Sequence, residues 1–148
     1  MTDIAAKKTP SKEDLQIARS CLLDCFADVE ASVICMQAKF GHKSSTAALG
    51  QRLDALRKVK AGPQLAKATV LQLSAFIERL SVLNGLRADV VHARMYVAPI
   101  AGEMRACFIN SLECDAEFPS ARLMTLDQFT KLNKELRELA TAMKFLIS

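Results

Sequence analysis

Apolar residues recur at spacings of three and four along most of the chain, which is the repeat of an amphipathic α-helix. The first stripe follows Ser11 and ends at Phe40. Its apolar positions are Leu15, Ala18, Leu22, Cys25, Phe26, Val29, Val33, Met36 and Phe40. Ser11 stands three residues before Asp14, as in a capping box, and Gly41 is typical of the residue after a helix. The pattern predicts one helix of about seven turns.

Two more helices are predicted in the middle of the chain. The stripe of the shorter one, from about Thr46 to Lys60, consists of Leu49, Leu53, Leu56 and Val59. Gly62-Pro63 ends it, and Pro63 suits the first turn of the next helix. The stripe of that helix consists of Leu65, Thr69, Leu73, Phe76, Ile77, Leu80, Leu83, Leu86, Val90 and Val91. Asn84-Gly85 is a candidate bend, but because the stripe continues beyond it we expect the helix to reach Arg94.

The helical repeat stops between residues 97 and 124. Arg105–Ser111 and Ala121–Met124 have the composition of strands and predict a small β-hairpin, joined by an acidic loop that contains Glu113, Asp115 and Glu117. Thr125 and Gln128 then repeat the capping-box spacing and open a last helix. The inward positions of that helix are Leu126, Phe129, Leu132, Leu136, Leu139, Met143 and Leu146.

The predicted fold is all-α, a bundle of four to five helices with a small β-hairpin before the C-terminal helix. Long helices joined by short links usually pack antiparallel. We expect residues 11–148 to form a single domain and residues 1–10 to be a flexible N-terminal tail. The chain shows no export signal and no apolar run long enough for a membrane, and its five cysteines are an odd number. This predicts a reduced, cytoplasmic protein with packed cysteines, no metal site and no cofactor.

Positive charge is concentrated between residues 39 and 67, where seven basic residues accompany one acid, Asp54. Such a stretch is either a surface for a polyanion or a solvated helix face. The candidate nucleic-acid-binding residues are Lys39, Lys43, Arg52, Arg57, Lys58 and Lys60. Phe40 is the one aromatic residue among them, so a base-stacking surface is not expected in this segment.

His92 is the candidate for acid–base chemistry, because histidine exchanges protons near neutral pH. Arg87 and Arg94 stand on either side of it, and arginine is well shaped to hold phosphate. On a continuous helix Asp89 and Tyr96 would lie beside His92 in one polar strip. Arg87 would lie about 140° around the axis and would have to curl toward a shared ligand. The alternative is an ordinary surface Asp–His pair.

The segment Leu80–His92, LSVLNGLRADVVH, resembles the signature helix of the HEPN superfamily (higher eukaryotes and prokaryotes nucleotide-binding). The family's hallmark is an arginine followed by a polar residue and, after four to six intervening residues, a histidine. Arg87 and His92 have four residues between them, and the resemblance covers about 15 residues closely. Ala88 departs from the hallmark, since the family usually has Asn, Asp or His there. Asp89 is the candidate replacement, and without it the site would be degenerate.

The resemblance implies a homodimer whose paired motifs form a composite, metal-independent ribonuclease site. Arg87 would hold the scissile phosphate, and His92 would act as acid or base while the RNA 2′-hydroxyl attacks. Asp89 would assist His92, with Tyr96 and Arg94 in support. Other members of the superfamily bind RNA or nucleotides without cleavage, or act as toxins beside an antitoxin. The implied partners are therefore a second copy, RNA or nucleotide, and an antitoxin-like protein.

Other functions remain open on the sequence. Ala88 favours a non-catalytic protein–protein interaction or dimerisation module. A histidine phosphotransfer domain also carries a histidine on a helical bundle, but Met95 and Tyr96 stand where those domains commonly have lysine and glycine. A Cys107–His92 pair would require the fold to bring the two together.

Overall fold

The computed structural model describes residues 8–40, 47–63, 65–109 and 121–148, and these are mostly helical. The helices are α1 (Lys12–Lys39), α2 (Leu49–Arg57), α3 (Lys67–His92) and α4 (Leu126–Ile147). The strands are β1 (Arg94–Ile100), β2 (Glu103–Ile109) and β3 (Ala121–Met124), which form one antiparallel sheet in the order β1-β2-β3. The prediction of a helical bundle is confirmed in outline, but the sheet has one strand more than the predicted hairpin.

Both predicted capping boxes form. The Ser11 hydroxyl accepts a hydrogen bond from the Asp14 amide at 3.1 Å, and the Ser11 amide donates to the Asp14 carboxylate at 2.8 Å. Thr125 and Gln128 repeat this exchange at 3.2 and 2.9 Å. These bonds satisfy amide groups that the first turn of a helix leaves without partners, so α1 and α4 begin where the sequence predicts.

The ends of α2 and α3 differ from the prediction. Gly62 and Leu65 exchange two backbone hydrogen bonds at 3.0 and 3.1 Å, and the turn they close holds Pro63 outside the helix. As a result α3 begins at Lys67 rather than at Pro63. It then passes Gly85 without a break and ends at His92, two residues before the predicted end. The shorter helix, α2, begins at Leu49 and ends at Arg57.

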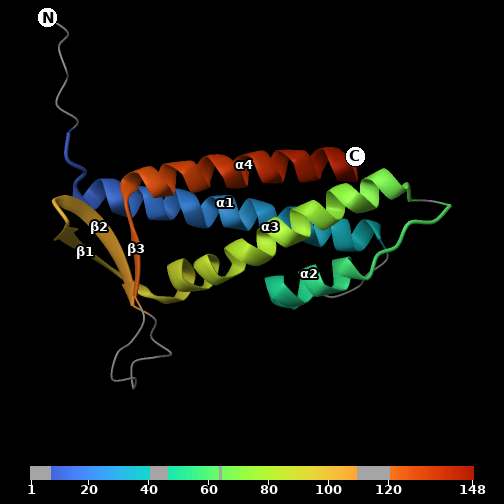
Figure 1. The fold of residues 1–148 in the computed structure, drawn as a ribbon, viewed down its shortest axis with the longest axis horizontal. Helices are drawn as coiled ribbons and strands as arrows, with labels where there is room; N and C mark the ends of the chain where they lie inside the picture. The colour runs from blue at the N-terminus through green and yellow to red at the C-terminus, as the bar shows by residue number, and fades with distance from the viewer. Residues whose placement is uncertain (1–7, 41–46, 64, 110–120) are drawn as a thin grey trace, which may run out of the picture.

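Three long helices lie along the molecule, with the sheet at one end (Figure 1). α1 and α4 lie side by side and run in the same direction. α3 runs in the opposite direction, from the far end of the molecule back to the sheet. The Lys39 ammonium at the end of α1 accordingly donates to the Ile147 carbonyl at the end of α4, at 2.6 Å. The antiparallel expectation concerns helices joined by short links; α1 and α4 are separated in the chain by α2, α3 and the sheet, and they pack parallel. α3 returns the chain to the end where α1 begins, and because the sheet lies at that end, α4 starts there too (Figure 1).

The predicted stripes supply most of the core. Its members in the helices are Leu15, Leu22, Cys25, Phe26, Val29, Val33, Met36, Leu49, Leu53, Leu56, Leu73, Ile77, Leu80, Leu83, Val90, Phe129, Leu136, Ala140 and Met143. One face of the sheet adds Ala106, Phe108 and Met124. Val91 is the exception, since it lies at the surface. No helix in the described ranges is long and apolar enough to cross a membrane.

Several predictions concern residues outside the described ranges. They are the helix-ending role of Gly41 and the acidic loop with Glu113, Asp115 and Glu117. Most of the N-terminal tail also lies there.

Candidate functional site

The C-terminal end of α3 is held in place by an arginine from α1. Arg19 donates to the Val90 carbonyl through Nε at 3.1 Å and through Nη2 at 2.8 Å, and to the Ala93 carbonyl at 3.2 Å. Its guanidinium also lies 5.7 Å from the centre of the Phe108 ring. The last carbonyls of a helix have no partner within it and carry partial negative charge, which a cation satisfies. Arg19 thus fixes the point at which α3 ends and β1 begins.

His92 is exposed on the last turn of α3. Its imidazole has neither a hydrogen bond nor an ion pair with any residue in the described ranges. The predicted polar strip of Asp89, His92 and Tyr96 on one helix is wrong, because α3 ends at His92 and Tyr96 lies on β1. Arg94, also on β1, has its guanidinium 5.3 Å from the centre of the Tyr96 ring.

The other two residues of the motif have charged partners on other elements. Arg87 forms an ion pair with Glu30 of α1, and 25% and 29% of the two side chains are exposed. The Asp89 carboxylate accepts a hydrogen bond from Arg122 Nε of β3 at 2.8 Å. Neither Arg87 nor Asp89 is hydrogen bonded to His92. The motif is therefore split, with two residues in ion pairs and the histidine turned to solvent.

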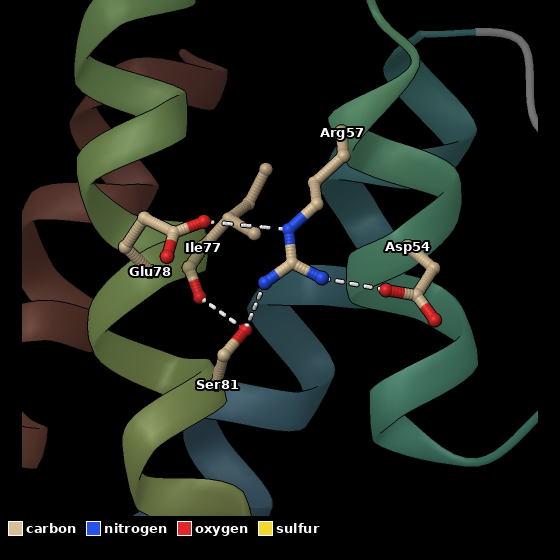
Figure 2. Close-up of polar contacts among 5 residues, drawn as sticks. All are labelled: Asp54, Arg57, Ile77, Glu78 and Ser81. Carbon is tan, nitrogen blue, oxygen red and sulfur yellow. Dashed lines mark hydrogen bonds and ion pairs between the residues drawn. The ribbon is translucent and has the colours of Figure 1, made fainter.

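In the predicted basic segment, both arginines form hydrogen bonds that stabilise the fold. Arg52 is only 7% exposed and donates to the Gln37 side chain at 2.7 Å and to the Ala47 carbonyl at 2.9 Å. Arg57 joins α2 to α3, as Figure 2 shows. Its guanidinium donates to Asp54 at 2.6 Å, to the Ser81 hydroxyl at 2.6 Å and to Glu78 at 3.4 Å.

The lysines of this segment are divided. Lys39 donates to the last carbonyls of α4, as described above, whereas Lys58 and Lys60 are exposed. Lys43 lies outside the described residues. Among the described lysines of residues 39–67, Lys58, Lys60 and also Lys67 thus remain exposed at the surface.

The cysteines differ in exposure. Cys25 is buried, Cys21 and Cys107 are half-buried, and Cys35 is exposed, while Cys114 lies outside the described ranges. Within those ranges, no group of three or more histidine, cysteine, aspartate or glutamate side chains is placed to hold a metal ion.

Arg19 and Arg122 are residues that the sequence did not reveal. Arg19 lies next to the apolar stripe of α1, and Arg122 lies in the strand predicted to close the hairpin. Each acts on the end of α3 from more than 30 positions away in the chain. No local spacing signals such contacts, which form only when α1 and the sheet pack against the end of α3.

Comparison of the chain with protein-family models, with curated proteins and with solved structures found no match in any of the three.

Proposed function

We propose that this protein is a HEPN-like helical domain that binds RNA through the end of α3, and that it binds RNA without cleaving it. The observation that carries the proposal is the position of His92. It is exposed on the last turn of α3, its imidazole makes no bond within the described ranges, and Arg19 holds the helix end beneath it. A phosphate or a base edge can therefore reach the ring without breaking a bond that the ring makes to any described residue.

The ion pair of Arg87 favours binding over cleavage. A composite ribonuclease site needs this arginine on the scissile phosphate, but its guanidinium pairs with Glu30. A pair that is only about a quarter exposed is screened little by salt, and phosphate would have to compete with a carboxylate already in place. Asp89 is likewise held by Arg122 instead of orienting His92. RNA recognition through His92 requires neither ion pair to break.

The test is a pair of measurements on one labelled single-stranded RNA, carried out in the presence of a chelator. Fluorescence anisotropy reports binding, and gel electrophoresis of the same sample reports cleavage. We expect His92→Ala to raise Kd about tenfold, as for loss of a hydrogen bond to a charged group. Gln72→Ala, an exposed polar position near the other end of α3, is the matched control and should bind as the unmodified protein does.

The outcomes separate the alternatives. Cleavage that disappears in His92→Ala would show a ribonuclease and overturn the non-cleaving assignment. Binding that is equal in the unmodified protein and in a folded His92→Ala variant would remove His92 from the site. Absence of RNA binding altogether would leave the interaction module as the better candidate.

A second candidate, a dimerisation module, is favoured by exposed apolar side chains on α3 and α4. Leu71 and Val82 are 63% and 70% exposed and lie eleven residues apart, on one face of α3. Phe145 on α4 is 77% exposed. Their partner would be a second copy or an antitoxin-like protein. Light scattering tests self-association, and a dimer that Val82→Asp dissociates would support this candidate.

A further inference from the structure

The sheet has two different faces. Residues paired directly across antiparallel strands share a face, so the register fixes its composition. One face carries Phe108, Ala106 and Met124 into the core. The opposite face, here called the open sheet face, has four rows, of which Ile100–Glu103 is the one nearest the turn between β1 and β2. The other three are Arg94–Ile109–Ala121, Tyr96–Cys107–Leu123 and Ala98–Arg105.

The open sheet face is apolar at its centre although solvent reaches it. Tyr96, Leu123 and Ile109 are 46%, 40% and 39% exposed. A solvated face of an antiparallel sheet normally carries polar side chains. Figure 1 shows the long helices on one side of the sheet, extending away from it. An exposed aromatic ring among apolar neighbours is the arrangement expected where a flat ligand stacks.

Two arginines on this face lack the carboxylate partners that several others have. Elsewhere in the described ranges, carboxylates pair with Arg57, Arg79, Arg87 and Arg122. Arg94 and Arg105 have no acidic partner within the described ranges, and Arg105 Nε is buried without a hydrogen-bond acceptor. Among the described residues, Glu103 is the one acid on this face, and it lies at the turn between β1 and β2. The face therefore joins a partly exposed ring, with the Arg94 guanidinium 5.3 Å from its centre, to guanidinium groups that lack anions among the described residues.

We propose that the open sheet face binds single-stranded RNA, with a base stacked on Tyr96 and backbone phosphates near Arg94 and Arg105. Aromatic rings that stack bases, together with arginines that meet phosphates, are the usual means of binding unpaired nucleic acid. This inference rests on the proposed function and extends it. β1 begins two residues after His92, so an RNA strand at the end of α3 continues onto the sheet.

A second copy of the chain fits this face less well. In a two-fold symmetric contact the same patch occurs on both sides, so Arg94 and Arg105 of both copies would enter one interface, where Glu103 is the one acid of the described residues of each face. Like charges brought together in an interface oppose association. RNA supplies the opposite charge and the flat apolar surface at once.

Tyr96 provides a direct readout, because it is the only tyrosine and the chain has no tryptophan. Stacking of a base on the phenol ring should quench its fluorescence. We expect quenching by a single-stranded RNA of about eight nucleotides, which matches the length that such surfaces cover. A duplex of the same sequence should quench little, because its bases are already stacked and do not reach the ring.

Binding of labelled RNA to variants supplies the second half of the test. Tyr96→Ala should raise Kd about tenfold, and Tyr96→Phe should bind as the unmodified protein does, because stacking needs the ring and not the hydroxyl. Phe145→Ala is the matched control, since it removes an exposed aromatic ring from α4. It should leave RNA affinity unchanged.

Failure of this inference and failure of the proposed function give different results. Suppose that RNA affinity falls in His92→Ala, but that RNA does not quench Tyr96 fluorescence and binds Tyr96→Ala as tightly as the unmodified protein. That result would overturn the assignment of RNA binding to the open sheet face alone. If RNA quenches Tyr96 fluorescence equally in His92→Ala, and RNA affinity depends on Tyr96 but not on His92, the role of His92 alone is overturned. No RNA binding would overturn both. A protein dimer that Leu123→Asp dissociates would assign the face to a second copy instead.

Discussion

Two regions of this molecule are rich in basic side chains, and they use them differently. In the segment from the end of α1 through α2, Arg52 is buried against Gln37 and Arg57 is held by Asp54, Glu78 and Ser81. On the open sheet face, Arg94 and Arg105 have no acidic partner in the described ranges. The first region has more basic residues in the sequence. The second has more guanidinium groups without an acidic partner among the described residues.

The difference shows why a run of basic residues is weak evidence for an anion site. A guanidinium that already donates to a carboxylate or a carbonyl has to lose those bonds before it meets phosphate. Surface charge available to RNA therefore depends on partners supplied by other elements. This comparison predicts that substitutions in the first region change stability, whereas those in the second change RNA binding.

The largest effect is expected for Arg52→Met. The variant loses hydrogen bonds to the Ala47 carbonyl and to Gln37, which is itself only 2% exposed. A buried acceptor left without its charged donor costs about 3 kcal/mol, and methionine restores only part of the packing. Urea denaturation should show this loss of unfolding free energy. RNA affinity should stay unchanged in the folded protein, and a selective loss of affinity would return Arg52 to the binding surface.

Arg19→Met is expected to have the next largest effect, about 2 kcal/mol of unfolding free energy. It removes the donors to the Val90 and Ala93 carbonyls and the contact with Phe108. Because Arg19 fixes the end of α3, the folded variant should also bind RNA more weakly. Arg137→Met, at an exposed arginine of α4, is the control for loss of charge alone. Equal RNA affinity in both variants would show that His92 does not depend on this anchor.

The helices were predictable because their signals are local. The capping boxes at Ser11 and Thr125 and the apolar stripes of α1 and α4 depend on residues within a few turns of one another. β1 was not predicted. It contains Pro99, a residue that argues against a strand in general but is tolerated in an edge strand such as this one. Its turn, Ala101-Gly102, also lacks the usual Asn-Gly signal, yet both residues adopt positive φ, at 53° and 77°.

The candidate site was only partly predictable, for the same reason. The spacing of Arg87 and His92 singled out the end of α3, and the structure leaves His92 exposed there. The partners of Arg87 and Asp89 come from Glu30 on α1 and Arg122 on β3. Long-range ion pairs follow from packing rather than from spacing, so the sequence alone could not show which charges were already occupied.

A smaller effect, on salt dependence, is expected for Arg94→Ala and Arg105→Ala. Each phosphate contact with single-stranded nucleic acid contributes about 0.7 to the slope of log K against log salt concentration. Each variant should lower the slope by about that amount, with little change in unfolding free energy. Lys58→Ala and Lys60→Ala, in the first region, test the contrast. A change in slope in these variants as large as that in Arg94→Ala would extend the RNA surface to the end of α2.

The smallest effect concerns an ion pair that lies in neither basic region. Arg79 of α3 forms a two-bond ion pair with Glu135 of α4, and this lowers the pKa of Glu135 below its usual value of 4.5. A carboxyl with a lowered pKa in the folded state stabilises the protein above its unfolded pKa, and this contribution disappears as pH falls through the folded pKa. The side chains are 43% and 32% exposed, so solvent screening keeps the gain below about 1 kcal/mol. Glu135→Gln should therefore reduce the loss of stability between about pH 5 and pH 3 in urea titrations, and should leave RNA binding at neutral pH unchanged. An unaltered pH profile would mean that the Arg79–Glu135 pair adds nothing measurable to the packing of α3 on α4.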